Sequence, residues 1–282
     1  MALNVGLFVV PDASDPARTV ELGVAADRAG LDVVAVQDHP YQRRFLDTWT
    51  LLSYLGARTE RIRLVPDVLN LPLRLPTLIA KSVASLDLLT GGRVELGIGA
   101  GAFWDAVAAM GGPRREPGES VDALSEAIQI IKGFLTGERS LRFEGTHYTV
   151  AGAQPGPPPA HPVGIWVGAY GPRMLELTGR LGDGWLPSVG GSYLAPDDVG
   201  ARQRAIDEAA RRAGRDPAEV ARIANVGLGE DPRSWLEPER LARAATELGF
   251  ETLLLAVPDD DPLDFVRRLG EEAAPAARAL RT

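Results

Sequence analysis

The sequence contains no cysteine, few histidines and no long hydrophobic run, and each absence narrows its possible functions. Without cysteine, the 282-residue chain has no disulfide bond, no thiolate nucleophile and no zinc–thiolate site. The three histidines stand apart from any carboxylate cluster with metal-ligand spacing, so we expect no metal site. The longest apolar runs, such as Leu3 to Pro11, are far shorter than the ~18 residues of a membrane span. With no basic segment ahead of an apolar run at the N-terminus, we expect a cytoplasmic protein without membrane association.

Basic residues are also too few for general nucleic-acid binding. The formal net charge is −8, whereas a protein that neutralises phosphates needs a basic surface. A hydrophobic fraction of 45% is ordinary for a globular protein and allows a sizeable core. Because single α/β barrels commonly have ~250 residues, we expect one domain over residues 1–282.

Eight short and mostly apolar segments, each followed by a helical pattern, predict an α/β fold. The order favours a (β/α)₈ TIM barrel over a doubly wound sheet, because no strand and turn near the N-terminus carries a dinucleotide glycine fingerprint. A small hairpin and a proline-rich stretch predict an insertion around residues 138–162. In such a barrel the segments after each strand share one face, which carries the active site. The expected strands cover residues 3–10, 31–37, 62–68, 94–98, 163–168, 184–188, 221–229 and 252–257.

The fourth strand opens into glycines at its C-terminal end, in the stretch Gly97-Ile98-Gly99-Ala100-Gly101. Glycine has no side chain to keep a ligand from the main chain, and it permits dihedrals closed to other residues. We therefore expect a flat or phosphorylated ligand here. Trp104 follows this loop directly and is the one tryptophan expected at the ligand; the others are expected in the core or an interface.

Asp38 and His39 end the second strand at the expected catalytic face. An imidazole there can exchange a proton near neutral pH, and an adjacent carboxylate can orient it. The alternative is that Asp38 only caps a turn before Pro40. His39 is the best acid–base candidate, because His147 and His161 fall in expected surface loops.

Two further segments point to a ligand at the same face. Asp67 interrupts the apolar third strand and Asn70 follows it, which indicates an irregular backbone at a ligand site or a simple strand end. The turn Gly168-Ala169-Tyr170-Gly171-Pro172-Arg173 precedes a helix, whose free N–H groups can hold a phosphate together with Arg173. The alternative is a tight turn in which Pro172 is merely the first helical residue.

In combination, four motifs spanning roughly residues 3 to 190 resemble the luciferase-like monooxygenase superfamily of flavin- or deazaflavin-dependent oxidoreductases. The motifs are Gln37-Asp38-His39, Arg58-Thr59-Glu60-Arg61-Ile62-Arg63-Leu64, Leu86-Asp87-Leu88-Leu89-Thr90-Gly91-Gly92-Arg93 with the glycine stretch, and the 168–173 turn with Gly182-Asp183-Gly184-Trp185.

The resemblance implies a TIM barrel with a flavin-type ring in its mouth. The phosphate of the cofactor would rest on Gly168, Gly171 and Arg173. A non-proline cis bulge would fall near Asp67-Val68, which with the Asp-His pair favours coenzyme F-420 over FMN. Some sugar-phosphate-oxidising relatives carry a glutamate after the glycine loop, where this chain has Ala102 and Phe103.

The resemblance further implies hydride transfer between F-420 and a small organic substrate, with His39 handling the proton and Asp38 contacting the ring. With FMN, the reaction would be monooxygenation, and a partner reductase would supply reduced flavin. Alternatives are a catalytically inactive flavin-binding barrel and an unrelated barrel lyase or hydrolase using Asp38 with Asp67. The expected cofactor-binding residues are Asp38, His39, Asp67, Val68, Asn70, Gly99, Gly101, Gly168, Ala169, Gly171, Pro172 and Arg173, and the expected substrate pocket is Tyr41, Phe103 and Trp104.

Relatives commonly pair through the helices after strands two and three, so the resemblance implies a homodimer. Trp49, Leu52 and Leu55 form an apolar face on the first of these helices. The alternative is that the same side chains face the barrel.

Overall fold

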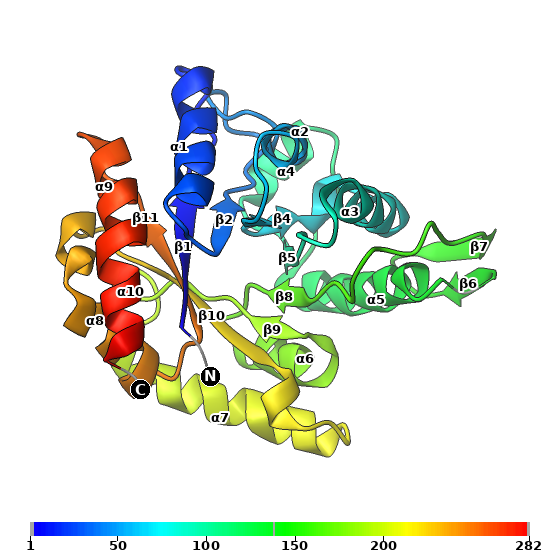
Figure 1. Ribbon diagram of the computed structural model, residues 1–282. Helices are drawn as coiled ribbons and strands as arrows, with labels where there is room; N and C mark the ends of the chain where they lie inside the picture. Colours follow the sequence, from blue (N-terminus) through cyan, green and yellow to red (C-terminus); the bar gives the residue numbers. More distant parts are fainter. Residues whose placement is uncertain (1–2, 138, 281–282) are drawn as a thin grey trace.

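The computed structural model describes residues 3–137 and 139–280, in which parallel strands are surrounded by helices (Figure 1). The strand order is β3-β2-β1-β11-β10-β9-β8-β5-β4. Short apolar strands are buried on both sides in this arrangement, which explains their near-continuous hydrophobic sequences. The strands are β1 (Asn4–Val9), β2 (Val33–Val36), β3 (Arg63–Pro66), β4 (Leu69–Asn70), β5 (Leu96–Gly99), β8 (Ile165–Val167), β9 (Gly184–Trp185), β10 (Ala221–Val226) and β11 (Thr252–Ala256).

The third barrel strand is divided into β3 and β4 by Asp67 and Val68. The peptide bond between these two residues is cis, as the resemblance implied. A parallel bridge between Leu64 and Val94 joins β3 to the residues before β5 and completes the ring. Counted with β3 and β4 as one interrupted strand, the barrel has the eight predicted strands, and the (β/α)₈ fold is confirmed.

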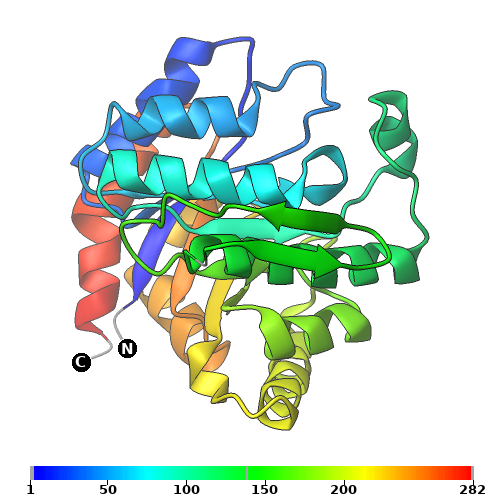
Figure 2. The same cartoon turned by 90° about the vertical axis from the view of Figure 1, so that its right-hand side faces the viewer.

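A helix follows each barrel strand and covers its outer side (Figures 1 and 2). The predicted helices are all present within a few residues, and proline at their first turn marks the start of most of them. Two short helices, α4 and α10, were not predicted. The helices are α1 (Pro16–Arg28), α2 (Thr48–Gly56), α3 (Pro76–Thr90), α4 (Trp104–Ala109), α5 (Pro117–Leu135), α6 (Pro172–Leu181), α7 (Pro196–Arg212), α8 (Pro238–Glu247), α9 (Pro262–Arg268) and α10 (Ala274–Ala279).

The predicted insertion is a two-stranded hairpin, β6 (Leu141–Glu144) and β7 (Thr149–Ala153), beside α5 (Figure 2). The carboxylate of Glu126 on α5 accepts the backbone N–H groups of Thr146, His147 and Tyr148, which fixes the hairpin tip. Residue 138, at the edge of the predicted insertion, lies outside the described residues.

The interior of the barrel is a separate hydrophobic cluster from the layer between strands and helices. Because side chains alternate along a strand, Val33 and Ala35 enter this interior while Val34 and Val36 face the helices. The interior residues are Phe8, Val33, Ala35, Val65, Trp166, Leu186, Ile223 and Leu254. In the described part of the chain, no helix is both long enough and apolar enough to cross a membrane.

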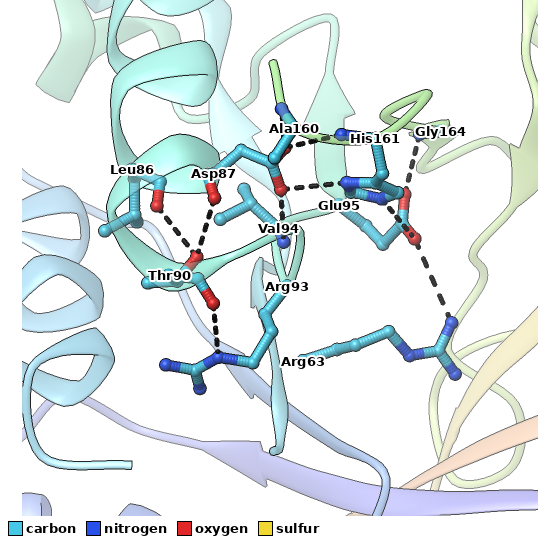
Figure 3. Close-up of polar contacts among 10 residues, drawn as sticks. All are labelled: Arg63, Leu86, Asp87, Thr90, Arg93, Val94, Glu95, Ala160, His161 and Gly164. Carbon is cyan, nitrogen blue, oxygen red and sulfur yellow. Dashed lines mark hydrogen bonds and ion pairs between the residues drawn. The ribbon is translucent and has the colours of Figure 1, made fainter. Parts of the chain in front are cut away.

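The Leu86-to-Arg93 motif, which carries part of the resemblance, has a structural role before β5 (Figure 3). The buried guanidinium of Arg93 donates to carbonyl oxygens of Gly56, Thr59 and Ile62, and so fixes the turn between α2 and β3. The carboxylate of Asp87 accepts the N–H groups of Val94 and Ala160. Two charged side chains thus take up backbone groups that loops would otherwise leave unpaired.

Candidate active site

A cavity of about 610 Å³ opens at the carboxyl ends of the barrel strands. It brings together residues that lie far apart in the sequence, because the segments after parallel strands share one face. Most of the predicted site residues line it: Asp38, His39, Tyr41, Asp67, Val68, Asn70, Gly99, Gly101, Gly168, Gly171, Pro172 and Arg173.

Three predicted residues do not line this cavity. Ala169 is fully buried, and its carbonyl accepts the indole N–H of Trp185, so its side chain belongs to the core. Phe103 is mostly exposed but contacts His39 edge-to-face, with ring centroids 5.6 Å apart. Trp104 begins α4, and its indole packs against Gly101. Phe103 and Trp104 therefore shape the rim around His39 and the glycine loop, whereas Ala169 has no surface facing a ligand.

The glycines of the strand ends make room for protein as well as for a ligand. A Cβ atom on Gly97 would lie 2.2 Å from the carbonyl oxygen of Pro66, and one on Gly99 would lie 2.9 Å from Val68. Gly168 approaches Val68 from the next strand, where a Cβ would lie 3.1 Å away. The side chain of Val68 is thus held between two glycines. Beside the room for a ligand expected from the sequence, the glycines thus make room for Val68.

Asp38 is buried, and both of its carboxylate oxygens have partners. One oxygen accepts the backbone N–H of Asn70 at 2.8 Å, and the other accepts the guanidinium of Arg74 at 3.2 Å. Arg74 also forms an ion pair with Asp47, at the start of α2, at 2.8 Å. Asp38 therefore links the end of β2 to the loop after β4. Sequence reasoning assigned no role to Arg74, although its charge in the apolar 70–76 loop is a visible signal.

His39 lies in an aromatic environment on the cavity wall. Its Nδ1 is 2.7 Å from the hydroxyl of Tyr41, and the rings of Tyr41, Phe45 and Phe103 surround it. Burial lowers the pKa of His39, with the nearby Asp38 charge opposing the effect. Burial and the Asp38 charge together raise the pKa of Tyr41 to about 12, so Tyr41 remains a protonated phenol. The pair is neutral near pH 7 and can exchange a proton with a ligand.

Asp67 and Asn225 both line the cavity, and their side chains contact each other. The amide nitrogen of Asn225 donates to Asp67 Oδ1 at 3.2 Å and to the hydroxyl of Ser188 at 3.4 Å. Burial raises the pKa of Asp67 from its ordinary 3.8 to about 7. Sequence reasoning missed Asn225, Ser188 and Tyr170 as site residues. The signal was present for Asn225, which is a polar residue in an apolar strand, as Asp67 is.

The N-terminus of α6 forms one rim of the cavity. Gly171 is its N-cap and offers no side-chain cap, so the first N–H groups of the helix are available to a ligand. A Cβ on Gly171 would meet nothing within 4 Å, so the space beside this residue is open. Arg173 lies in the first turn and forms an exposed ion pair with Asp122 at 2.7 Å. This rim can hold an anion such as a phosphate.

The fold and this cavity define a (β/α)₈ barrel protein with a small-molecule site at the carboxyl ends of its strands. The chain belongs to the luciferase-like monooxygenase family, which matches residues 3–229. It is 30% identical to the F420-dependent glucose-6-phosphate dehydrogenase of Segniliparus rotundus, over 99% of both chains.

Solved structures with the same fold include an F420-dependent secondary alcohol dehydrogenase in complex with an F420–acetone adduct, with a TM-score of 0.83 at 20% identity over 98% of this chain and 99% of that one. They also include the FMN-bound oxygenating constituent of 3,6-diketocamphane monooxygenase from Pseudomonas putida, with a TM-score of 0.75 at 20% identity over 98% of both chains. Both likenesses concern the fold, because the identities are low.

Proposed function

We propose that this protein is an oxidoreductase that transfers a hydride between coenzyme F420 and a small organic substrate. The observation that carries the proposal is the cavity itself, which combines a neutral His39–Tyr41 pair on its wall with an anion-binding helix N-terminus on its rim. The full-length similarity to an F420-dependent dehydrogenase supports the choice of cofactor.

The residues present fit a phosphorylated deazaflavin. The uncapped N-terminus of α6, with Gly168, Gly171 and Arg173, would hold its phosphate. Three buried oxygens of the cavity have no hydrogen-bond partner among the described residues, and polar groups of a ligand can pair with them. Val68, Gly99 and Gly168 form a tightly packed apolar wall on which a flat ring can rest.

In the proposed reaction, bound F420 supplies a carbon that accepts or releases a hydride. With its Nδ1–H donated to the oxygen of Tyr41, His39 presents Nε2 to take the proton of a substrate hydroxyl as the hydride leaves. In the opposite direction, the protonated imidazole returns that proton to a carbonyl oxygen. Asp38 holds the loop at Asn70 and stabilises the charge that His39 gains. The rings of Phe45 and Phe103 contact the imidazole and help to hold it in place.

The substrate we propose is small and carries no phosphate. Among the described cavity-lining residues, Arg173 is the single arginine or lysine, and the proposed cofactor phosphate takes it. A sugar phosphate would need a second cationic group. Some sugar-phosphate-oxidising relatives have a glutamate just after the glycine loop. This chain has Ala102 and Phe103 there.

The proposal is tested by titrating the purified protein in parallel with F420 and FMN, each oxidised and reduced, and following the fluorescence of the cofactor. We expect tight binding of F420 and weak binding of FMN. The reverse result would replace hydride transfer by oxygen activation with FMN and direct a search for a partner reductase. Binding of neither cofactor would overturn the assignment, and binding of F420 without turnover of any alcohol, alkene or imine would favour the inactive flavin-binding barrel.

We also propose that the protein acts as a homodimer, in the cytoplasm and as one domain. On α2, Leu52 and Leu55 are buried in the core, which agrees with the alternative that these side chains face the barrel. Exposed leucines lie instead along α3: Leu75 is its N-cap residue, and Leu78 and Leu89 lie within the helix on one stripe by helical spacing. A groove of about 350 Å³, lined by Trp49, Leu75 and Leu78 among others, adjoins this stripe.

A further inference from the structure

Three buried oxygens around the cavity have no hydrogen-bond partner among the described residues. They are Asp67 Oδ2, Asn70 Oδ1 and Asn225 Oδ1, and all three residues line the cavity. Buried polar atoms in proteins are almost always paired. A ligand that fills the cavity is therefore expected to bring polar groups to them.

Asp67 and Asn225 form the floor of the cavity. Asp67 follows β3 and Asn225 lies in β10, and three strands, β2, β1 and β11, stand between β3 and β10 in the sheet order. The 3.2 Å hydrogen bond between their side chains thus crosses the barrel. Two residues earlier on each strand, Val65 and Ile223 belong to the hydrophobic interior. The pair separates this interior from the space where a ligand lies.

No described cation contacts Asp67, unlike the other buried carboxylate of the cavity, Asp38, which has Arg74. The one hydrogen bond to the Asp67 side chain comes from the uncharged amide of Asn225. An isolated carboxylate above an apolar interior is costly, and burial raises the pKa of Asp67 to about 7. The other titratable or charged groups around the cavity are Asp38 and His39 after β2, Tyr41 and Tyr170 in loops, Tyr193 after β9, and Arg173 on α6.

Building on the proposed function, we propose that the neutral carboxyl of Asp67 and the amide of Asn225 bind the imide edge of the deazaflavin ring. That edge presents an N–H group between two carbonyl oxygens. A neutral carboxyl matches an adjacent carbonyl and N–H, because it donates through its O–H and accepts through its other oxygen. A carboxylate would accept only, and it would repel the carbonyl oxygens. Binding of this edge would therefore favour the protonated form of Asp67.

The dissociation constant of F420, measured by fluorescence quenching from about pH 6 to about pH 9, tests this assignment with wild-type protein and Asp67→Asn. Wild-type affinity is expected to fall about tenfold per pH unit above about pH 7, as Asp67 of the free protein loses its proton. Asparagine keeps the shape and one hydrogen-bond donor but does not titrate. The affinity of Asp67→Asn for F420 is therefore expected to change less than about threefold over this pH range through titration at position 67. Ionisation of the coenzyme itself is common to both proteins and cancels in their ratio.

A second variant and a direct measurement of protonation keep the test decisive even if Asp67→Asn does not fold. Asn225→Ala removes the partner on the floor and is expected to weaken F420 binding about tenfold. The ¹³C chemical shift of the Asp67 carboxyl reports its protonation directly, and it should remain that of a protonated acid at about pH 8 when F420 is bound. A carboxylate shift in the loaded protein would overturn the assignment.

The outcomes separate this inference from the proposed function. If wild-type protein binds F420 and Asp67→Asn shows the same pH profile, the floor assignment is wrong and the proposed function stands. If wild-type protein binds neither F420 nor FMN, the proposed function fails first. FMN has the same imide edge, so the same difference between the two proteins with FMN would support the floor assignment with the other cofactor.

Discussion

The protonation state of His39 is set by its surroundings and decides how the site works. Its imidazole is half-buried among aromatic rings, and burial lowers its pKa below the ordinary 6.5. A lowered pKa keeps the imidazole neutral at pH 7, which is the form that accepts a proton. At saturating F420 we therefore expect substrate oxidation to decline on the acid side, as His39 becomes protonated at a lower pH than an ordinary histidine.

Replacement of His39 by glutamine is expected to lower turnover about a hundredfold to ten-thousandfold, because the proton acceptor is lost. The acid limb of the pH–rate profile should disappear with it. Affinity for F420, measured by fluorescence, serves as the control for folding and should remain within about tenfold. Tyr41→Phe, which removes the partner of Nδ1, should give a smaller loss. Unchanged turnover in His39→Gln would remove His39 from the mechanism.

Arg173 and Asp122 offer a matched pair of substitutions at the proposed phosphate site. Their ion pair is more than half exposed, so it contributes little to stability. Arg173→Ala should weaken F420 binding about tenfold or more, because a charged hydrogen bond to the phosphate is lost. Asp122→Asn should strengthen binding about twofold to fivefold, because the guanidinium is freed. Equal dissociation constants for both variants and the wild type would place the phosphate elsewhere.

At the same scale, several residues of the cavity could be predicted from the sequence because a polar side chain ends an apolar strand. Asp38, His39, Asp67 and Asn70 were found in this way, and all four line the cavity. Asn225 carried the same signal but stands one residue before the end of its strand, and its significance depends on Asp67 across the barrel. Such a pairing requires barrel geometry, which local sequence does not encode.

The helices and strands of the barrel could be predicted because local sequence features mark where most of them begin or end. Proline at the first turn marks α1, α3, α5 and α6, and the αL glycine Gly91 ends α3. Helix α4 was missed, because Trp104 to Ala109 is short and follows Phe103 in a left-handed conformation. The polar Asp67 in an apolar strand indicated an irregular backbone where β3 and β4 divide, whereas the cis peptide bond was expected only from the resemblance.

Asp87 controls how the segment before β8 packs on α3. It is completely buried, and its Oδ2 accepts the N–H groups of Ala160 and His161 while Oδ1 accepts that of Val94 (Figure 3). In Asp87→Asn an amide N–H₂ would face these donors. We expect the free energy of unfolding to fall by about 3 kcal/mol, because charged hydrogen bonds are lost in a buried site.

Chemical denaturation measures this loss, and hydrogen exchange should show faster exchange at residues 160–164. Glu144→Gln on the exposed side of the hairpin is the control and should change stability by less than about 0.5 kcal/mol. If Asp87→Asn unfolds at the denaturant concentration of the wild type, the carboxylate does not hold this segment.

At the scale of the whole molecule, the closed barrel explains why one face carries the chemistry. Parallel strands direct all their carboxyl ends to the cavity, while the interior below it is filled by side chains such as Trp166 and Leu254. The number and order of strands could be predicted, since right-handed crossovers leave few arrangements. Which apolar helix faces are exposed could not be predicted. Leu52 and Leu55 have the same helical periodicity whether their helix faces the barrel or another subunit, and they are buried.

The exposed stripe on α3 predicts how two copies associate. Leu75, Leu78 and Leu89 are 59%, 60% and 84% exposed, and such a stripe beside a groove is typical of an interface. Wild-type protein should sediment at twice the chain mass of 30.1 kDa. Leu78→Asp should shift it to the monomer, because an interface of roughly 1,000 Å² or more does not tolerate a central unpaired charge. Leu280→Asp, on the last turn after α10, is the control and should remain dimeric. A monomeric wild type at micromolar concentration would leave the stripe without this role.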